Sequence, residues 1–391
     1  MKSAHFTLAL LFLPIGGLGC VGVARQVAPD EHTPDANRPD SGEVGTDASS
    51  AVDSGTVGID VPEGTDAYIE PPPTGTAPRD NATVYFVGHS LVSHRDMYQG
   101  GAQTIPEVLS GLARSGGQAY SEFLHTTPGA PLSWNWNEVS NLRREIETNA
   151  SRYDTMVVTE GVFLDQAYMW HQSPFYARRF FCSLASARPD AELFVYETWH
   201  HVYGTDPDGD YDPPHVHDWR QQLRDDRPRW ERIADEASTG RTPTPDSYYG
   251  GAGDCGGSLT VRLIPAGTAL GALYDRIEAG DDFGGLTIHT LIQNGYSNWP
   301  NEWPVPASEA GSVDWRSRMS SMNTVHSGPV DDIHHGAAMA YYVGLVMYAT
   351  IYRRNPTGLP AANGVSAPVA RRMQELVWQV VTNDSRTGVV R

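Results

Sequence analysis

Two side chains near opposite ends of the sequence are of the types that form a nucleophile and its base. Ser90 follows the short apolar run 83–87, which is typical of a strand buried on both faces. His334 stands three residues after Asp331, just before a long apolar stretch. A carboxylate at this spacing can orient one imidazole nitrogen, so that the other takes a proton from a hydroxyl. The pattern predicts a Ser-His-Asp hydrolytic site.

Both halves of this pattern have an ordinary structural alternative. A serine at the end of a strand is commonly a helix cap or a turn residue. Asp331 or Asp332 could cap the helix that follows, with His334 and His335 as surface residues. Asp332 with His335 is also a second possible acid–base pair. The sequence around Ser90 lacks the second glycine of the G-x-S-x-G motif.

Alternating apolar runs and amphipathic segments predict the elements that would bring Ser90 and His334 together. The expected strands are 83–87, 119–124, 154–159, 191–197 and 286–292. The expected helices are 105–113, 175–187, 270–279, 335–353 and 367–381. This order predicts an α/β fold, a three-layer α/β/α sandwich with a central parallel sheet of the flavodoxin-like type. The carboxyl ends of parallel strands meet at one edge of the sheet, where ligands bind.

The region from about 204 to 257 interrupts the alternation. It reads as loops around one helical piece, 219–237, and we interpret it as a lid or substrate-binding insertion. Its acidic run 206–212 does not fit the EF-hand pattern. The group His215, His217 and Asp218 has no second cluster to complete a metal site. We therefore expect no metal and no other cofactor.

Two short motifs resemble those of the SGNH (GDSL-like) hydrolase superfamily. They are Phe86-Val-Gly-His-Ser-Leu91 near the start of the domain and Asp331-Asp-Ile-His334 near its end. The resemblance implies an esterase of the α/β/α type. Ser90 would attack the ester carbonyl, and His334 would act as general base and then general acid. Asp331 would orient His334. The family spacing favours Asp331 and His334 over Asp332 and His335, because the family histidine follows an apolar residue.

The same resemblance implies an oxyanion hole. Its donors would be the backbone N–H groups of Ser90 and of Gly129, which lies in the segment TTPGAPLSWNW after the second strand. The family often has an asparagine after the third strand, but this sequence has Thr159 and Glu160 there. Either of the two could replace the missing donor. Three further residues are expected to line the substrate site: His89, Trp199 and His200. For Trp199 and His200, packing against the insertion is the alternative.

The first 80 residues predict export and a tether. Residues 1–19 have the basic start and short apolar core of a signal peptide, and Cys20 resembles a bacterial lipidation site. An ordinary signal peptide cut nearby is the alternative. Residues 21–80 form an acidic, Pro/Gly/Ser-rich linker that cannot bury a core. We expect a domain over 81–391 that is extracytoplasmic and anchored to a bacterial membrane through Cys20. Cys182 and Cys255 form either one disulfide or two separate buried thiols.

The charge and the aromatic residues of the sequence indicate which classes of partner the protein binds. The formal net charge of −19 argues against nucleic acid. Tryptophans expected in loops can stack on sugar rings or, alternatively, form small local cores: Trp134, Trp136, Trp299 and Trp303. We therefore expect an acyl ester substrate, acetyl in the first instance, on a polysaccharide. The alternatives are a lipase or thioesterase on small acyl esters, a non-catalytic carbohydrate-binding lipoprotein and, more weakly, a metallo-phosphoesterase.

Overall fold

The computed structural model describes residues 77–94, 103–161, 164–200, 216–240, 255–292 and 333–390, apart from a few side chains within α5, α7 and α9. All described residues belong to one compact unit, Pro73–Arg391. Several predictions lie outside the described residues: the signal peptide, Cys20 and nearly all of the linker, the pair Asp331 and Asp332, Trp299 and Trp303, and His215 with the side chains of His217 and Asp218.

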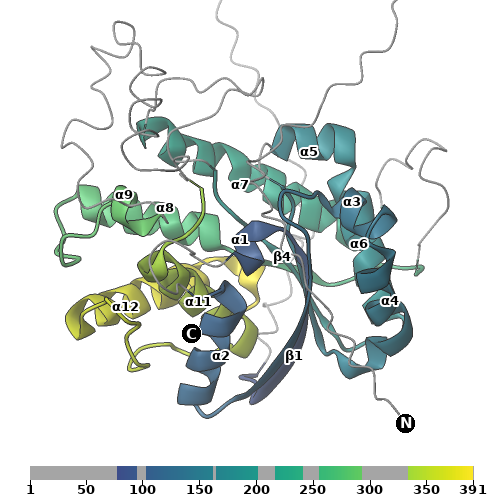
Figure 1. The fold of residues 1–391 in the computed structure, drawn as a ribbon, viewed down its shortest axis with the longest axis horizontal. Coiled ribbons are helices and arrows are strands. Elements are labelled where there is room, and N and C mark those ends of the chain that lie inside the picture. Colours follow the sequence, from purple (N-terminus) through teal and green to yellow (C-terminus); the bar gives the residue numbers. More distant parts are fainter. Residues whose placement is uncertain are drawn as a thin grey trace, which may run out of the picture. The chain divides into compact units, whose positions relative to one another are not determined.

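The centre of the folded unit is a parallel sheet of five strands (Figure 1). The strands are β1 (Asn81–Gly88), β2 (Ala119–Thr126), β3 (Thr155–Val158), β4 (Glu192–Tyr196) and β5 (Val261–Ile264), in the order β2-β1-β3-β4-β5. Phe86 of β1 pairs with Leu124 of β2 on one side and with Val157 of β3 on the other. All four pairings are parallel, so the carboxyl ends of the strands share one edge.

Helices cover both faces of the sheet, which confirms the predicted three-layer sandwich (Figure 1). Along β1, Val84 and Phe86 enter one core cluster, whereas Tyr85 and Val87 enter the other. The first cluster is completed by α2 (Ile105–Ser115), α8 (Ala266–Glu278), α11 (Ala337–Tyr352) and α12 (Ala367–Asn383). The second is completed by α3 (Leu132–Asn137), α4 (Ser140–Asn149), η1 (Ala150–Arg152) and α6 (Ser173–Ala185). The remaining short elements are α1 (Ser90–Ser93), α5 (Leu164–His171), α9 (Ile288–Leu291) and η3 (Ser385–Thr387).

The helix that follows His334 is a core helix. Every side chain of α11 from Met339 to Tyr352 is buried, as expected for a helix that is apolar on all sides. Its close neighbour α2 starts with a capping box between Thr104 and Glu107. Gly344 lets the two helices approach, because a Cβ there would lie 2.5 Å from Val108 Cγ1. No helix in the described part of the chain is long and apolar enough to cross a membrane.

The fifth strand was predicted in the wrong place. The segment predicted as a strand, 286–292, contains α9, which begins with a capping box between Thr287 and Thr290. Only Ile292 makes a bridge, antiparallel to His335. The actual edge strand β5 has four residues, among them Arg262, whose guanidinium reaches toward Glu192. Its charge and short length hide it from a search for apolar runs.

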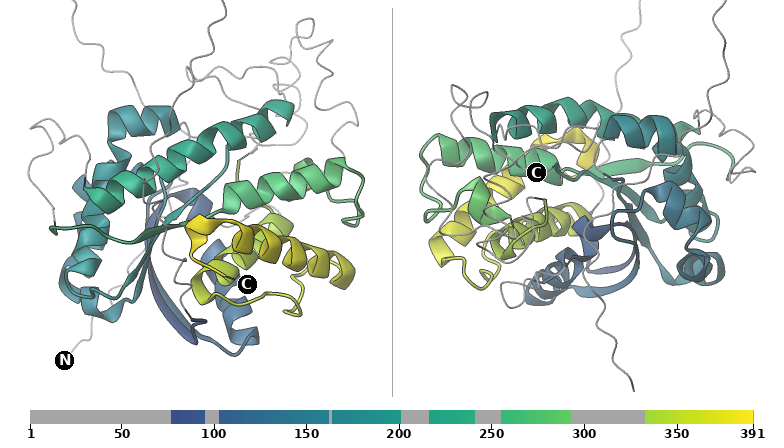
Figure 2. Two further views of the ribbon diagram at one scale, coloured as in Figure 1. Left: turned by 180° about the vertical axis from the view of Figure 1, so that it is seen from behind. Right: turned by 45° about the horizontal axis from the view of Figure 1, so that its top comes forward.

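The helix inside the predicted insertion belongs to the sandwich itself. Helix α7 (Val216–Thr239) connects β4 to the parallel β5 and contacts α6, α8 and both strands (Figure 2). It buries Trp219, Trp230 and Ile233. The helix is thus a crossover helix of the fold and not part of a lid. The flanking segments 201–215 and 241–254 lie outside the described residues, and a lid formed by them stays a prediction.

A disulfide links α6 to the segment before β5. Cys182 and Cys255 are bonded, with Cα atoms 5.2 Å apart. This settles the alternative left open by the sequence in favour of one disulfide. Arg178, one helical turn before Cys182, donates to the carbonyls of Ala237 and Gly257 and so secures the end of α7 and the bonded segment.

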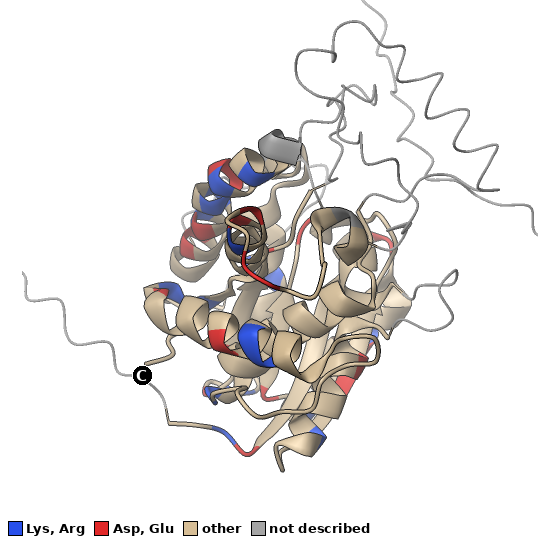
Figure 3. Cartoon of the chain, turned by 90° about the vertical axis from the view of Figure 1, so that its left-hand side faces the viewer, with Lys and Arg blue, Asp and Glu red and all other residues tan. Residues whose placement is uncertain are grey.

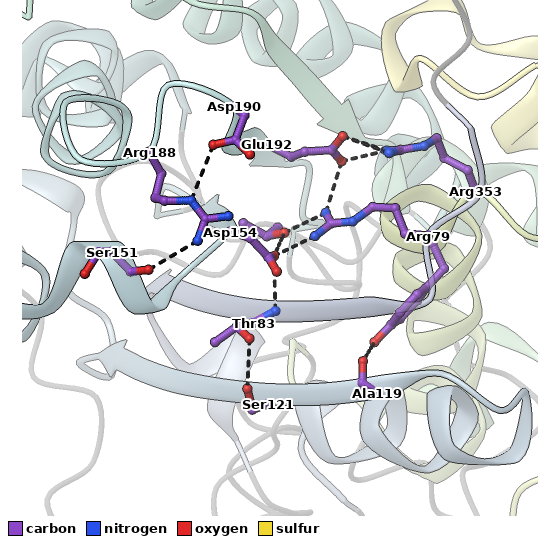
Figure 4. Close-up of polar contacts among 12 residues, drawn as sticks. Arg79, Thr83, Ala119, Ser121, Ser151, Asp154, Arg188, Asp190, Glu192 and Arg353 are labelled. Carbon is purple, nitrogen blue, oxygen red and sulfur yellow. Dashed lines mark hydrogen bonds and ion pairs between the residues drawn. The ribbon is translucent and has the colours of Figure 1, made fainter.

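Charged side chains close the amino edge of the sheet (Figure 4). Arg79 binds Asp154 at 2.6 Å and Glu192 at 3.3 Å, and Arg353 binds Glu192 at 2.6 Å. Arg353 Nε also donates to the carbonyl of Ala77, at 2.8 Å. Residue 77, which lies before the predicted boundary at residue 80, thus contacts the folded unit.

Elsewhere, basic and acidic residues alternate along the outer helices (Figure 3). The i,i+4 pairs include Arg227–Glu231, Arg232–Glu236 and Arg371–Glu375.

Candidate active site

Ser90 stands where the sequence places it, at the carboxyl edge of the sheet. β1 ends at Gly88, His89 is the N-cap of α1, and Ser90 is the first residue of that helix. Ser90 is partly exposed, whereas His89 and Leu91 are buried. The turn is tight, because a Cβ on Gly88 would lie 2.5 Å from Thr159 Cγ2. A glycine is needed where β1 and β3 end side by side.

Two hydrogen bonds fix the turn before Ser90. The carbonyl of Gly88 accepts from the backbone N–H of Thr127 at 3.0 Å and from Asn135 Nδ2 at 2.9 Å. Thr127 follows β2, and Asn135 is a fully buried residue of α3. The ends of β1 and β2 and the start of α3 are thereby joined around the serine.

His334 comes to the same place from the other end of the chain. Its ring stacks on the ring of His94, with centroids 3.9 Å apart and an angle of 18° between planes. The backbone N–H of His94 donates to the carbonyl of Ser90 at 2.7 Å, which closes the α1 turn. The charge of His334 also contributes to the lowered pKa of His89, after burial. The structure thus brings His334 to the helical turn that Ser90 begins.

The neighbouring His335 occupies a different environment. It is completely buried, pairs with Ile292, and lies edge-on to Trp199 with ring centroids 6.5 Å apart. His334 is only partly buried. Because a base must reach both serine and substrate, this difference favours His334 over His335 as the catalytic imidazole. Its predicted partner Asp331 lies outside the described residues.

Trp199, predicted to line the substrate site, is instead a fully buried support. Its Nε1 donates to the carbonyl of Ile333 at 2.7 Å. This bond holds the segment that carries His334 against the end of β4. Trp199 therefore supports the segment before His334, and because it is fully buried it does not reach the substrate.

Gly129 lies in a turn directly after β2. Ala130 N donates to the carbonyl of Thr127 at 3.1 Å, and Gly129 has a φ of +67°. A glycine following a proline at these positions is typical of a type II turn. A Cβ on Gly129 would meet no heavy atom within 4 Å, so one side of the turn is open. The turn keeps the predicted oxyanion donor close to the β1–α1 turn that carries Ser90, because the backbone N–H of Thr127 donates to Gly88 O.

Thr159 does not fit the role of the missing oxyanion donor. Its backbone N–H donates to Val87 O at 3.0 Å, and its hydroxyl donates to Tyr196 O at 2.8 Å. Both donors are consumed by neighbouring strands, and the residue is buried. The prediction that Thr159 completes the oxyanion hole is therefore corrected.

Glu160 is buried as an acceptor. Its carboxylate accepts from the backbone N–H of Gly161 at 2.8 Å and of Leu132 at 3.2 Å. Burial raises the pKa of Glu160 to about 7, and these two hydrogen bonds oppose that shift. The side chain is directed at the start of α3 and joins backbone groups. It does not present a donor of its own in the ionised state.

His89 caps helix α1 and does not line the substrate site. Its Nε2 bonds the carbonyl of Glu160 at 2.8 Å, and its Nδ1 accepts from Leu91 N at 3.4 Å. These partners assign the neutral tautomer with the proton on Nε2. Burial lowers the pKa of His89 to about 4, which keeps the ring neutral.

His200, also predicted to line the site, is buried and hydrogen-bonded to a buried carboxylate. Its Nε2 bonds Asp226, which in turn accepts from Arg229 at 2.5 Å. The His200 carbonyl accepts from Trp219 Nε1 at 3.0 Å. These contacts fasten α7 to the end of β4. Within the described residues, no three His, Cys, Asp or Glu side chains converge to hold a metal ion.

Two of the tryptophans expected in loops lie on a helix. Trp134 and Trp136 are part of α3. Trp136 is 9% exposed and stacks under Arg179, whose guanidinium carbon is 4.4 Å from the ring centroid. Trp134 is 52% exposed. Of this pair, only Trp134 is exposed.

Solved structures with a similar chain trace include proteins of the SGNH class. A DUF4886 family protein from Bacteroides uniformis is similar at 11% identity with a TM-score of 0.40, over 77% of this chain and 95% of that one. A protein from Slackia heliotrinireducens described as a candidate SGNH hydrolase is similar at 14% identity with a TM-score of 0.34, over 69% and 99%. A variant of an acetyl xylan esterase from Geobacillus stearothermophilus is similar at 11% identity with a TM-score of 0.33, over 70% and 93%.

No family model matches the chain, and no curated protein sequence matches it. The parallel sheet and three layers seen here agree with the fold class predicted from the sequence. At such identities and TM-scores the likeness does not extend to chemistry. The activity has to be inferred from this chain's own residues.

The sequence did not predict the hydrogen bond of Asn135 to Gly88 or those of the Glu160 carboxylate. Asn135 stands between Trp134 and Trp136, and no local sequence pattern marks it as a hydrogen-bond donor. Its buried bond to Gly88 O depends on where α3 packs, which no local pattern shows. A signal did exist for Glu160: an acid directly after a buried strand needs buried partners.

Proposed function

We propose that this protein is a serine esterase of the SGNH type. The observation that supports it most is the meeting of His334 with the α1 turn that starts at Ser90. Two residues far apart in the sequence, of the types that form a nucleophile and a base, reach one edge of the sheet. Ser90 is partly exposed at that edge, as a nucleophile must be.

The reaction follows from these roles. Ser90 Oγ attacks the ester carbonyl while His334 takes the hydroxyl proton, which gives a tetrahedral oxyanion. The intermediate collapses as His334 returns the proton to the leaving alcohol, and an acyl-serine remains. Water, deprotonated by His334, then attacks the acyl carbon and releases the acid and Ser90. Asp331 orients His334 and stabilises the imidazolium.

The oxyanion would be bound by two backbone groups. Ser90 N–H is at the first position of α1, where helix N–H groups lack an intrahelical partner. Gly129 N–H belongs to the open turn after β2. Removing one such donor typically lowers the rate by about 100- to 1000-fold. Thr159 has no donor left for this purpose, so the site works with the backbone pair.

An acetylated polysaccharide is the substrate that the surface favours. Large exposed apolar side chains gather on the two helices that follow β2 and β3: Trp134 of α3 (52% exposed), with Met169 (62%) and Trp170 (73%) of α5. Both helices contact α6 and start near the carboxyl edge that holds Ser90. Separate indole rings suit the apolar faces of sugar rings. A lipase or thioesterase would instead enclose an acyl chain in an apolar tunnel.

The proposal includes export and anchoring through a lipid on Cys20. The Cys182–Cys255 disulfide supports an oxidising compartment. Expression of the full chain in a bacterial host, followed by detergent phase separation, tests the anchor. The wild-type chain should enter the detergent phase, and Cys20→Ser should remain in the aqueous phase. Equal partition of both chains would remove the lipid anchor.

Hydrolysis of p-nitrophenyl acetate by the full chain tests the activity. Ser90→Ala and His334→Ala should lower kcat by about 1000-fold or more. Ser93→Ala is the matched control, because Ser93 is on the same helix and accepts a bond from Thr126 Oγ1 at 2.9 Å. It should keep kcat within about twofold.

The same assay decides the remaining alternatives. Asp331→Asn should be strongly impaired and Asp332→Asn nearly normal, because only Asp331 is assigned to His334. An equal trace rate in all variants would contradict the esterase. If the wild-type chain also releases no acetate from acetylated xylan yet binds it, the carbohydrate-binding reading replaces it. Full activity in a chelator would exclude a metal-dependent phosphoesterase.

A further inference from the structure

Glu160 connects three chain segments around the candidate site. It follows β3, and its side chain is only 1% exposed. Oε1 accepts from Gly161 N at 2.8 Å and from Leu132 N at 3.2 Å, while Oε2 lies 3.4 Å from Leu132 N. Its main-chain carbonyl bonds His89 Nε2 at 2.8 Å. One residue thus contacts both the α1 turn and the beginning of α3.

Each of these contacts is close to one of the two proposed oxyanion donors. His89 directly precedes Ser90, and Leu132 comes three residues after Gly129. The N-cap of α3 is Pro131, which makes no side-chain capping bond. The first N–H of α3 would otherwise lack a partner, and a buried N–H without one is costly. The Glu160 carboxylate supplies that partner from another part of the fold.

We propose that Glu160 is a positioning residue that holds the Ser90 and Gly129 backbone N–H groups at the spacing an oxyanion requires, without touching the substrate. In this proposal the residue after β3 does not itself donate a hydrogen bond to the oxyanion. It acts as a clamp that holds in place the two backbone N–H groups that do. The proposal rests on the serine esterase function. It accounts for a buried acid at the position where a donor was expected.

The surroundings of the carboxyl group make the clamp sensitive to pH. β1 and α1 present His89, α3 presents the Leu132 N–H, and α6 presents Ser173. Burial raises the pKa of Glu160 to about 7, whereas burial lowers that of His89 to about 4, so His89 stays neutral throughout this range. A protonated carboxyl has fewer acceptor sites for the two N–H groups than a carboxylate. The clamp should therefore loosen as pH falls through about 7.

Steady-state kinetics of the full chain on p-nitrophenyl acetate test the proposal. Glu160→Ala should lower kcat by about 100-fold, near the effect of losing one oxyanion donor, with KM within about twofold. Glu160→Gln keeps one acceptor oxygen in the same shape, and should recover kcat to within about tenfold of the wild-type value. The wild-type kcat should fall more steeply below about pH 7 than that of Glu160→Gln, because loosening of the Glu160 clamp adds to the loss of the general base.

Glu197→Gln is the matched control. Glu197 is a buried acid that follows β4, equally exposed at 1%, and burial also raises its pKa to about 7. Its partners are Arg227 and Thr268, away from the α1 turn. This variant should keep kcat within about twofold and retain the steeper wild-type fall of kcat below about pH 7. An equal loss of kcat in the two Gln variants would reduce Glu160 to a general structural role.

Two outcomes separate this inference from the esterase proposal. If hydrolysis depends on Ser90 but folded Glu160→Gln and Glu160→Ala keep wild-type kcat, the clamp is wrong and the esterase stands. If hydrolysis does not depend on Ser90, the esterase itself is wrong. Should Glu160→Ala fail to fold, Glu160→Gln decides through kcat and the pH profile.

Discussion

The ring of His334 lies flat on the ring of His94, with centroids 3.9 Å apart and planes 18° from parallel. His94 closes the turn that Ser90 begins, since its N–H donates to Ser90 O. The stack therefore sets the plane of the proposed base relative to the proposed nucleophile. His335 also lies edge-on to His94, at 6.2 Å, so that three imidazoles meet beside α1.

Loss of the His94 ring should impair hydrolysis by misplacing His334. We expect His94→Ala to lower kcat by about tenfold, which corresponds to the roughly 1.4 kcal/mol of a good aromatic pair. His94→Phe keeps a flat ring and should stay within about threefold of the wild-type kcat. Kinetics on p-nitrophenyl acetate measure both. Equal losses in the two variants would show that the stack does not orient His334.

Gly88→Ala should destabilise the elbow between β1 and α1. The added Cβ would lie 2.5 Å from Thr159 Cγ2, and overpacking of this kind typically costs about 1–3 kcal/mol. Removing that methyl with Thr159→Ser, which keeps the hydroxyl bonded to Tyr196 O, should restore much of the loss. Urea unfolding of the two single variants and the double variant gives the coupling energy. Purely additive effects would contradict this contact.

Acid should weaken the fold through His89. Burial lowers its pKa from 6.5 to about 4, so the unfolded chain binds more protons between these values. Stability from this group is present above pH 6.5 and is lost as pH falls to 4, by about 3 kcal/mol. The buried acids Glu160 and Glu197 shift in the opposite sense, so a difference measurement is needed. The stability gap between wild type and His89→Gln should shrink as pH falls from 7 to 4.

The disulfide should contribute strongly to stability. It joins residues 73 positions apart, and a loop of that size corresponds to about 4 kcal/mol in the chain-entropy account. In a Cys20→Ser background the unfolded chain should show no reactive thiol before reduction and two after it. The double variant Cys182→Ala/Cys255→Ala should unfold at lower urea concentration. Two thiols before reduction would mean that the bond does not form.

The elements that carry Ser90 and His334 were predictable because their signals are local. The apolar run of β1 and the long apolar helix α11 stand out in the sequence, and each is adjacent to its functional residue. The strand predicted over 286–292 was wrong, because a short apolar run does not distinguish a strand from a helix. The Thr287–Thr290 capping box favours the helix α9 there. The four residues of β5 are too few to show any period.

The contacts around the site were not predictable because they join distant segments. Trp199, His200 and His89 were expected to line the site on account of their place after strands. In the structure all three support other segments instead: Trp199 is hydrogen-bonded to Ile333, His200 to Asp226 and His89 to Glu160. Which face a strand-end side chain takes depends on the packing of α1, α7 and the segment before α11. Sequence spacing alone does not contain that information.

Covalent labelling tests the central claim most directly. The full chain is treated with diisopropyl fluorophosphate, which phosphorylates activated serines, and the label is located by peptide mass spectrometry. The account predicts stoichiometric label on Ser90, little or none in His334→Ala, and normal labelling in Ser93→Ala. No label on Ser90 in the folded wild-type chain, or equal labelling with and without His334, would contradict the assignment of Ser90 as a nucleophile activated by His334.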